Sequence, residues 1–72
     1  MTLRLLSYNI RYGGKHREHP LASVIRAAGA DVVVLQEARE PGVVARLADE
    51  TSLPYWGARK GHSTGFLSRI PV

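Results

Sequence analysis

The chain has 72 residues, of which 44% are hydrophobic and none is cysteine. Without cysteine it has neither disulfides nor thiolate zinc sites, the usual means of stabilising so small a core. The formal net charge of +4 is compatible with a polyanionic partner such as nucleic acid. A solvated surface with a surplus of arginine would give the same balance.

No segment of the sequence is typical of a signal peptide or of a membrane span. The amino-terminal stretch MTLRLLSYNI has one arginine and a brief apolar run that Ser7 and Asn9 interrupt. No apolar run approaches the roughly 20 residues of a transmembrane helix. A cytoplasmic location is therefore the default expectation.

The first half of the chain predicts a strand, a helix and a second strand. Residues 3–10 read as a strand, and the Gly-Gly pair in RYGGKHREHP predicts a loop. The following helix should begin near Pro20 and end at Gly29, with an apolar stripe of Leu21, Val24, Ile25 and Ala28. The aliphatic run at 32–35 predicts a strand in a sheet covered on both faces. A helical crossover makes the two strands parallel.

The second half predicts another helix and a hairpin. Pro41 begins a stretch whose apolar side consists of Val43, Val44, Leu47 and Ala48, and residues 51–54 break it. Residues 55–59 and 64–68 are typical of two short strands joined by the loop KGHS. The predicted fold class is α/β (α+β in some schemes). Its open sheet edges indicate that residues 1–72 are the incomplete amino-terminal portion of a single larger domain.

Two polar side chains end the two predicted parallel strands. Asn9 closes the first strand, and Glu37 closes the second. Ligands of open α/β sheets bind outside the carboxyl ends of the strands, so we expect these residues to lie side by side where a site belongs. A glutamate oxygen beside an amide oxygen suits a hard cation such as Mg²⁺. The alternative is that Asn9 forms a turn and Glu37 is solvated.

Three segments in order along the chain, LRLLSYNIRYGG, DVVVLQEARE and STGFLSRIPV, resemble recurring segments of the endonuclease/exonuclease/phosphatase superfamily. This superfamily has the DNase I-like fold, so the resemblance implies a four-layer α/β sandwich of two mixed sheets flanked by helices. It also implies a metal-dependent hydrolase of phosphodiester or phosphomonoester bonds. The substrate would be DNA, RNA, a phosphoinositide, sphingomyelin or a related ester. The net positive charge of the chain slightly favours nucleic acid among these.

The same resemblance implies roles for individual residues. Glu37 matches the metal-binding glutamate, with Mg²⁺ or Mn²⁺ as the ion, and Asn9 matches the asparagine beside the metal and the scissile phosphate. Arg39 matches a position that approaches the substrate backbone; the alternative is an exposed arginine paired with Glu40. Gln36 is expected to support the site by hydrogen bonds.

The remaining polar candidates are expected to lie outside the chemistry. His16 and His19 fall in a charged loop and His62 in the hairpin turn, where histidines are commonly solvated. Ser68 and Arg69 end the last predicted strand, where we expect them to support the site loop; the alternative is a turn and a surface charge.

The superfamily's Asp-His pair and Asp-x-Asn segment, which lie in the second half of its members, are not among these 72 residues. The family consists of enzymes, but this chain alone is expected to be inactive because it carries one side of an active site. The alternative function is a small basic α/β module that binds nucleic acid without catalysis.

Overall fold

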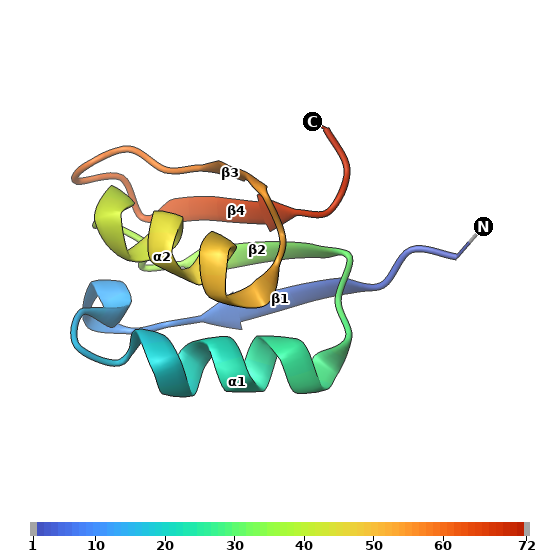
Figure 1. Ribbon diagram of the computed structural model, residues 1–72. Coiled ribbons are helices and arrows are strands. Elements are labelled where there is room, and N and C mark those ends of the chain that lie inside the picture. The colour runs from blue at the N-terminus through green and yellow to red at the C-terminus, as the bar shows by residue number, and fades with distance from the viewer. Residues whose placement is uncertain (1, 72) are drawn as a thin grey trace.

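The computed structural model describes residues 2–71 and places four strands in one mixed sheet (Figure 1). The elements in chain order are β1 (Leu5–Asn9), the 3-10 helix η1 (Tyr12–Gly14), α1 (Glu18–Ala28), β2 (Val32–Gln36), α2 (Pro41–Thr51), β3 (Tyr55–Gly57) and β4 (Thr64–Ser68). The sheet order is β1-β2-β4-β3, in which β1 and β2 are parallel and β4 is antiparallel to both neighbours. The predicted α/β class and the predicted parallel pair are confirmed.

Local signals set several element boundaries as predicted. Gly29 ends α1 in the left-handed conformation, and its N–H donates to the Arg26 carbonyl oxygen. Pro41 lies in the first turn of α2, where its missing N–H costs nothing. Pro20 has the same advantage in α1, although that helix begins two residues earlier, at Glu18.

Two strands are shorter than predicted because their partners limit them. β1 covers residues 5–9 instead of 3–10, since its one neighbour, β2, pairs with it over five positions. β3 covers residues 55–57 instead of 55–59 because it pairs with β4 over three positions. The connection between β3 and β4 is consequently a loop of residues 58–63, two residues longer than KGHS.

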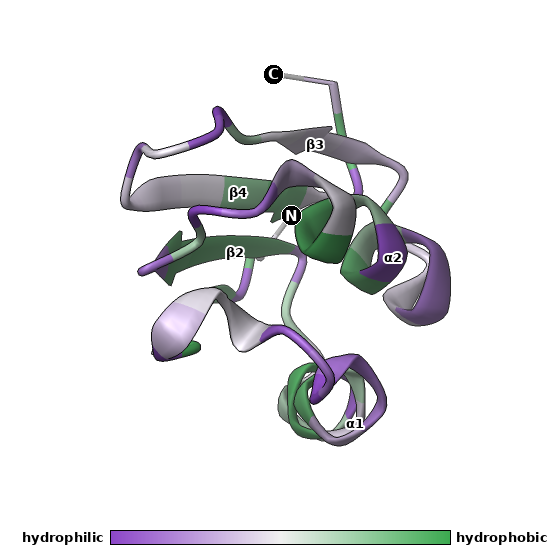
Figure 2. Cartoon of the chain, turned by 90° about the vertical axis from the view of Figure 1, so that its left-hand side faces the viewer, coloured by the Kyte–Doolittle hydropathy of each residue, from purple (hydrophilic) through white to green (hydrophobic). Residues whose placement is uncertain are grey.

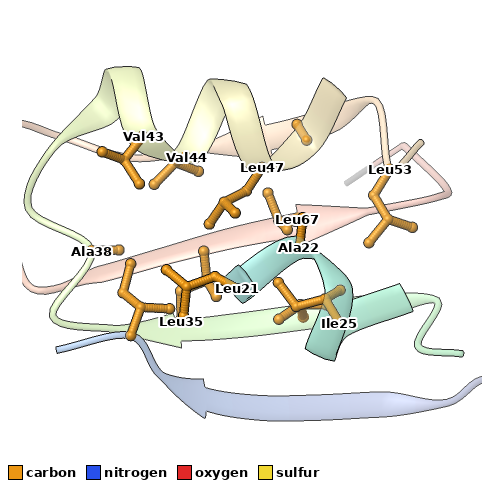
Figure 3. Packing of buried hydrophobic residues seen from close by; sticks show 13 residues of the cluster. Leu21, Ala22, Ile25, Leu35, Ala38, Val43, Val44, Leu47, Leu53 and Leu67 are labelled. Carbon is orange, nitrogen blue, oxygen red and sulfur yellow. The ribbon is translucent and has the colours of Figure 1, made fainter. Parts of the chain in front are cut away.

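Both helices bury their apolar sides against the same face of the sheet (Figure 3). Each is 11 residues long, and no helix within residues 2–71 is long and apolar enough to cross a membrane. Full burial of an aliphatic side chain contributes about 1.5–3 kcal/mol, so this layer holds the fold together. The largest fully buried hydrophobic side chains are Ile10, Ile25, Leu35, Leu47, Leu67, Val33 and Val44.

No helix within residues 2–71 covers the other face of the sheet. Side chains alternate along a strand, so Val34 and Phe66 point away from the core and are only half-buried. Leu5 on β1 is 71% exposed. The prediction that β2 is covered on both faces is therefore wrong for the described part of the chain, because both helices pack on the side of Val33 and Leu35.

Candidate functional site

Asn9 and Glu37 are neighbours at the carboxyl ends of β1 and β2. Asn9 lies opposite Gln36 in the parallel register, and Glu37 is the next residue along the chain. The Ile10 N–H donates to the Gln36 carbonyl oxygen at 3.2 Å, which extends the pairing one residue beyond β1. The predicted position of these two residues, side by side at one end of the sheet, is confirmed.

The Glu37 carboxylate is held by hydrogen bonds while remaining open to solvent. Its backbone is left-handed (φ 58°), its side chain is 38% exposed, and Oε1 accepts the Tyr12 N–H at 3.1 Å. This backbone hydrogen bond, followed by one from the Asn9 side chain, lowers the pKa of Glu37 below its ordinary value of 4.5. The positive charges of Arg39 and Arg11 act in the same direction, and partial desolvation opposes them. Glu37 is therefore a charged carboxylate at neutral pH.

Asn9 is also the turn former that the alternative interpretation describes. Its Oδ1 accepts the Arg11 N–H at 2.9 Å, which closes a turn directly after β1. An amide oxygen has two lone pairs, so this hydrogen bond leaves one for a further contact. The Asn9 amide nitrogen donates to Glu37, so a cation would contact Asn9 through this remaining lone pair.

A tight turn of residues 10–17 brings the Tyr12 N–H to Glu37. The Arg17 Nη2 donates to the Ile10 carbonyl oxygen at 2.6 Å and also to the Arg11 carbonyl oxygen. A positive φ is uncommon outside glycine and persists only where surrounding contacts stabilise it. The two hydrogen bonds from Arg17 stabilise this turn. The residues of the turn with positive φ are Arg11, Tyr12, Gly13, Gly14 and His16.

The contributions of Tyr12 and Arg17 were not predicted from the sequence. The Gly13-Gly14 pair indicates a break in the chain, but no local signal says which backbone N–H the turn presents or where it points. A basic residue shortly after a Gly-Gly turn is a weak indication that carbonyl groups of the turn have a side-chain donor. In this chain that donor is Arg17.

The two polar neighbours of Glu37 have partners that differ from those expected. Gln36 Nε2 donates to the Ser7 hydroxyl at 2.8 Å across the open face of the sheet, so its hydrogen bond goes to β1. Arg39 Nη2 lies 3.9 Å from Glu37 Oε1, and the Arg39 side chain is 49% exposed. Within residues 2–71 no ion pair joins Arg39 to Glu40, because the left-handed turn at Glu37 brings its own carboxylate within reach of the guanidinium.

Within residues 2–71, none of the three histidines contacts Glu37. His16 and His62 are exposed in loops, as predicted. His19 belongs to α1 instead of the preceding loop, and its Nδ1 lies 3.3 Å from Glu50 Oε1 on α2. None of these contacts joins a histidine to Glu37.

Ser68 and Arg69 lie at the opposite end of the sheet from Glu37, so the prediction that they support the site loop is wrong. The reason is the antiparallel direction of β4, which places Ser68 opposite Val32 at the start of β2. The Ser68 hydroxyl donates to the Ile70 carbonyl oxygen at 2.6 Å, and Arg69 pairs with Asp31 at 2.7 Å.

The carboxyl ends of β1 and β2 carry two oxygen-bearing side chains, those of Asn9 and Glu37. Within the described range, 2–71, no group of three or more His, Cys, Asp or Glu side chains is placed to hold a metal. Glu37 and the Asn9 amide would be the protein ligands, and such oxygen donors suit Mg²⁺, which binds through one or two carboxylates and keeps several waters. Arg39, 3.9 Å from the same carboxylate, would compete with the cation.

Comparisons of the chain with protein-family models, with curated proteins and with solved structures found no match. The fold defines the chain as an α/β protein with a carboxylate and an amide at the carboxyl ends of two parallel strands.

Proposed function

We propose that this chain is the amino-terminal part of a metal-dependent phosphoesterase domain of the endonuclease/exonuclease/phosphatase superfamily. One observation supports the proposal above the others. Asn9 and Glu37, the two residues that the resemblance assigns to the metal, are 28 positions apart in the sequence and are neighbours in the fold.

The uncovered face of the sheet also supports a larger domain. Val34 and Phe66 are half-buried and Leu5 is largely exposed on that face. The resemblance implies a second packed sheet, and aliphatic and aromatic side chains of this kind are what one sheet presents to another.

The residues of this chain would bind and orient the reacting group. Glu37, kept charged by the Tyr12 N–H and the Asn9 side chain, would hold Mg²⁺ or Mn²⁺ with Asn9 as a second ligand. The bound ion would supply Lewis-acid stabilisation of charge on the phosphoryl oxygens. Arg39, half exposed beside Glu37, would bind a phosphate oxygen of the substrate.

Metal binding at Glu37 tests the proposal directly. We expect Mn²⁺ added to the ¹⁵N-labelled chain to broaden the amide signals of Asn9, Tyr12 and Glu37 first, because a paramagnetic ion acts on nearby nuclei. Glu37→Gln should abolish this selective broadening. Glu50→Gln, on α2 beside His19, is the matched control and should leave it unchanged.

Broadening that survives in Glu37→Gln, or that spreads evenly over the acidic residues, would contradict the proposed site.

The 72-residue chain is also expected to show no turnover of plasmid DNA or of a generic phosphodiester with Mg²⁺ or Mn²⁺. General acid–base catalysis is worth about 10²–10⁴-fold, and none of the three histidines contacts Glu37. Activity that Glu37→Ala removes would show that the chain holds a complete site.

The alternative, a basic module that binds nucleic acid without chemistry, makes the opposite prediction in the same experiment. Such a module would bind an oligonucleotide equally well with and without the Glu37 carboxylate and would show no selective Mn²⁺ effect. The two functions are therefore separated by the metal response and not by nucleic-acid binding alone.

A further inference from the structure

The whole net charge of the chain lies in three loops at one end of the sheet. These loops are residues 10–17, 37–40 and 58–63, and together they contain six basic and two acidic residues. The remainder of the chain has four basic and four acidic residues, so its formal charge is zero and the loops account for all of the +4. The basic residues of the loops are Arg11, Lys15, Arg17, Arg39, Arg59 and Lys60, and the acidic ones are Glu37 and Glu40.

Hydrogen bonds join the three loops into one surface. The Gly61 N–H donates to the Arg39 carbonyl oxygen at 3.2 Å, and the Ala38 N–H donates to the Ser63 carbonyl oxygen at 2.8 Å. The Tyr12 N–H ties the first loop to the second through Glu37. Figure 2 looks onto this end of the molecule, where the connecting segments are largely hydrophilic.

Between the loops lies a hollow of about 370 Å³, near the lower end of the roughly 300–1,000 Å³ typical of small-ligand sites. Two cations, Arg39 and Lys60, line it. Glu40 also lines it and repels an anion on its own side, so the cations must outweigh one carboxylate. The full set of lining residues is Tyr12, Gly13, Arg39, Glu40, Lys60 and Gly61.

Tyr12 distinguishes this hollow from a simple basic patch. Tyr12 lines the hollow together with the two cations, and the residue is 81% exposed. A positively charged groove with an exposed aromatic ring is the combination that binds single-stranded nucleic acid, because the cations contact phosphates and the ring stacks on a base.

A nucleic-acid strand fits these observations better than an anionic membrane surface. Insertion into a membrane needs several apolar side chains on one exposed face. Tyr12 alone among the large exposed hydrophobic residues of the described range lies in the three loops; the others are Leu3, Leu5, Val24, Tyr55 and Trp56.

We propose that the three loops bind a single-stranded segment of nucleic acid, with a backbone phosphate between Arg39 and Lys60 and an adjoining base against Tyr12. This rests on the proposed function insofar as it names the substrate class of the same site. The binding itself uses no metal, so it can be measured with Glu37 left uncoordinated.

Fluorescence polarisation of the 72-residue chain with labelled oligodeoxythymidylate and oligouridylate, in EDTA, tests the proposal. We expect binding at low salt that weakens markedly at about 200 mM salt, as phosphate contacts require. Lys60→Glu and Tyr12→Ala should each weaken binding at least about fivefold. Arg46→Glu on α2 and Tyr55→Ala on β3 are matched controls, since both residues are exposed and neither lines the hollow, and they should change it less than about twofold.

An equal loss in Lys60→Glu and Arg46→Glu would overturn the proposal, because binding would then follow net charge alone. Binding to phosphatidylserine vesicles without binding to either oligonucleotide would overturn it in favour of a membrane surface. Amide shifts of the unmodified chain on oligonucleotide addition provide a second measurement, and they should centre on Tyr12, Arg39 and Gly61. If Mn²⁺ gave no selective broadening, oligonucleotide binding would still support this proposal. If no oligonucleotide bound, selective Mn²⁺ broadening would still support the proposed metal site.

Discussion

Replacing Gly14 by alanine should destabilise the turn of residues 10–17, which presents the Tyr12 N–H to Glu37. Gly14 is buried and left-handed, with φ +71°. A Cβ at this position would lie 2.9 Å from Leu21 Cδ1, 3.1 Å from Ile10 Cδ1 and 3.3 Å from Val43 Cγ1. The substitution therefore imposes backbone strain, an overlap with Leu21 and tight contacts with Ile10 and Val43.

The expected loss of stability is the sum of two costs. Alanine in the left-handed region costs about 1–2 kcal/mol, and overpacking of a core costs typically about 1–3 kcal/mol. The total of about 2–5 kcal/mol is large for a chain of 72 residues, whose whole stability is expected near 4–11 kcal/mol at about 0.05–0.15 kcal/mol per residue.

Gly61→Ala separates the two costs. Gly61 is also left-handed, with φ +81°, but it lies on the exposed β3–β4 loop, where an added Cβ would have no neighbour within 4 Å. It should lose only the backbone part, about 1–2 kcal/mol. Urea unfolding followed by circular dichroism gives both values. Equal losses for the two variants would refute the reasoning, because they would mean that Ile10, Leu21 and Val43 do not pack around Gly14.

Three further predictions concern the site and its supports. Arg17→Ala should lower the free energy of unfolding by about 1.5–3 kcal/mol, since it removes a charged donor from two carbonyl groups. It should also speed hydrogen exchange at the Tyr12 amide. Unchanged exchange at that amide would show that Arg17 does not hold the turn. The pKa of Glu37, measured by NMR titration of its carboxyl carbon, should lie below 4.5 because of the Tyr12 N–H. The ionised Glu37 carboxylate then contributes its full stabilisation above about pH 4.5 and loses it as the pH falls through the lower pKa of the folded state. A pKa at or above 4.5 would contradict a net stabilisation of the carboxylate by its hydrogen bonds and neighbouring charges. Gly42→Ala, in the first turn of α2 with nothing within 4 Å, should raise stability by up to about 1 kcal/mol, and a loss would contradict the open space at that position.

The elements that could be predicted from the sequence are those whose signals lie within a few residues. Gly29 ends α1, Pro41 begins α2, and the short strand predicted at 64–68 is β4 with its observed bounds. The neighbouring positions of Asn9 and Glu37 could also be predicted, since a helical crossover between two strands makes them parallel and aligns their carboxyl ends.

The sequence by itself thus determined the α/β class and the end of the sheet where the polar strand ends meet. The tertiary structure alone decided which groups surround Glu37. Tyr12, whose N–H binds its carboxylate, is 25 residues away, and Arg69, expected near the site, lies at the opposite end because β4 runs antiparallel to β2. Propensity and periodicity act over one element, whereas these contacts depend on how separate elements pack and in which direction each strand runs, and no local pattern carries that information.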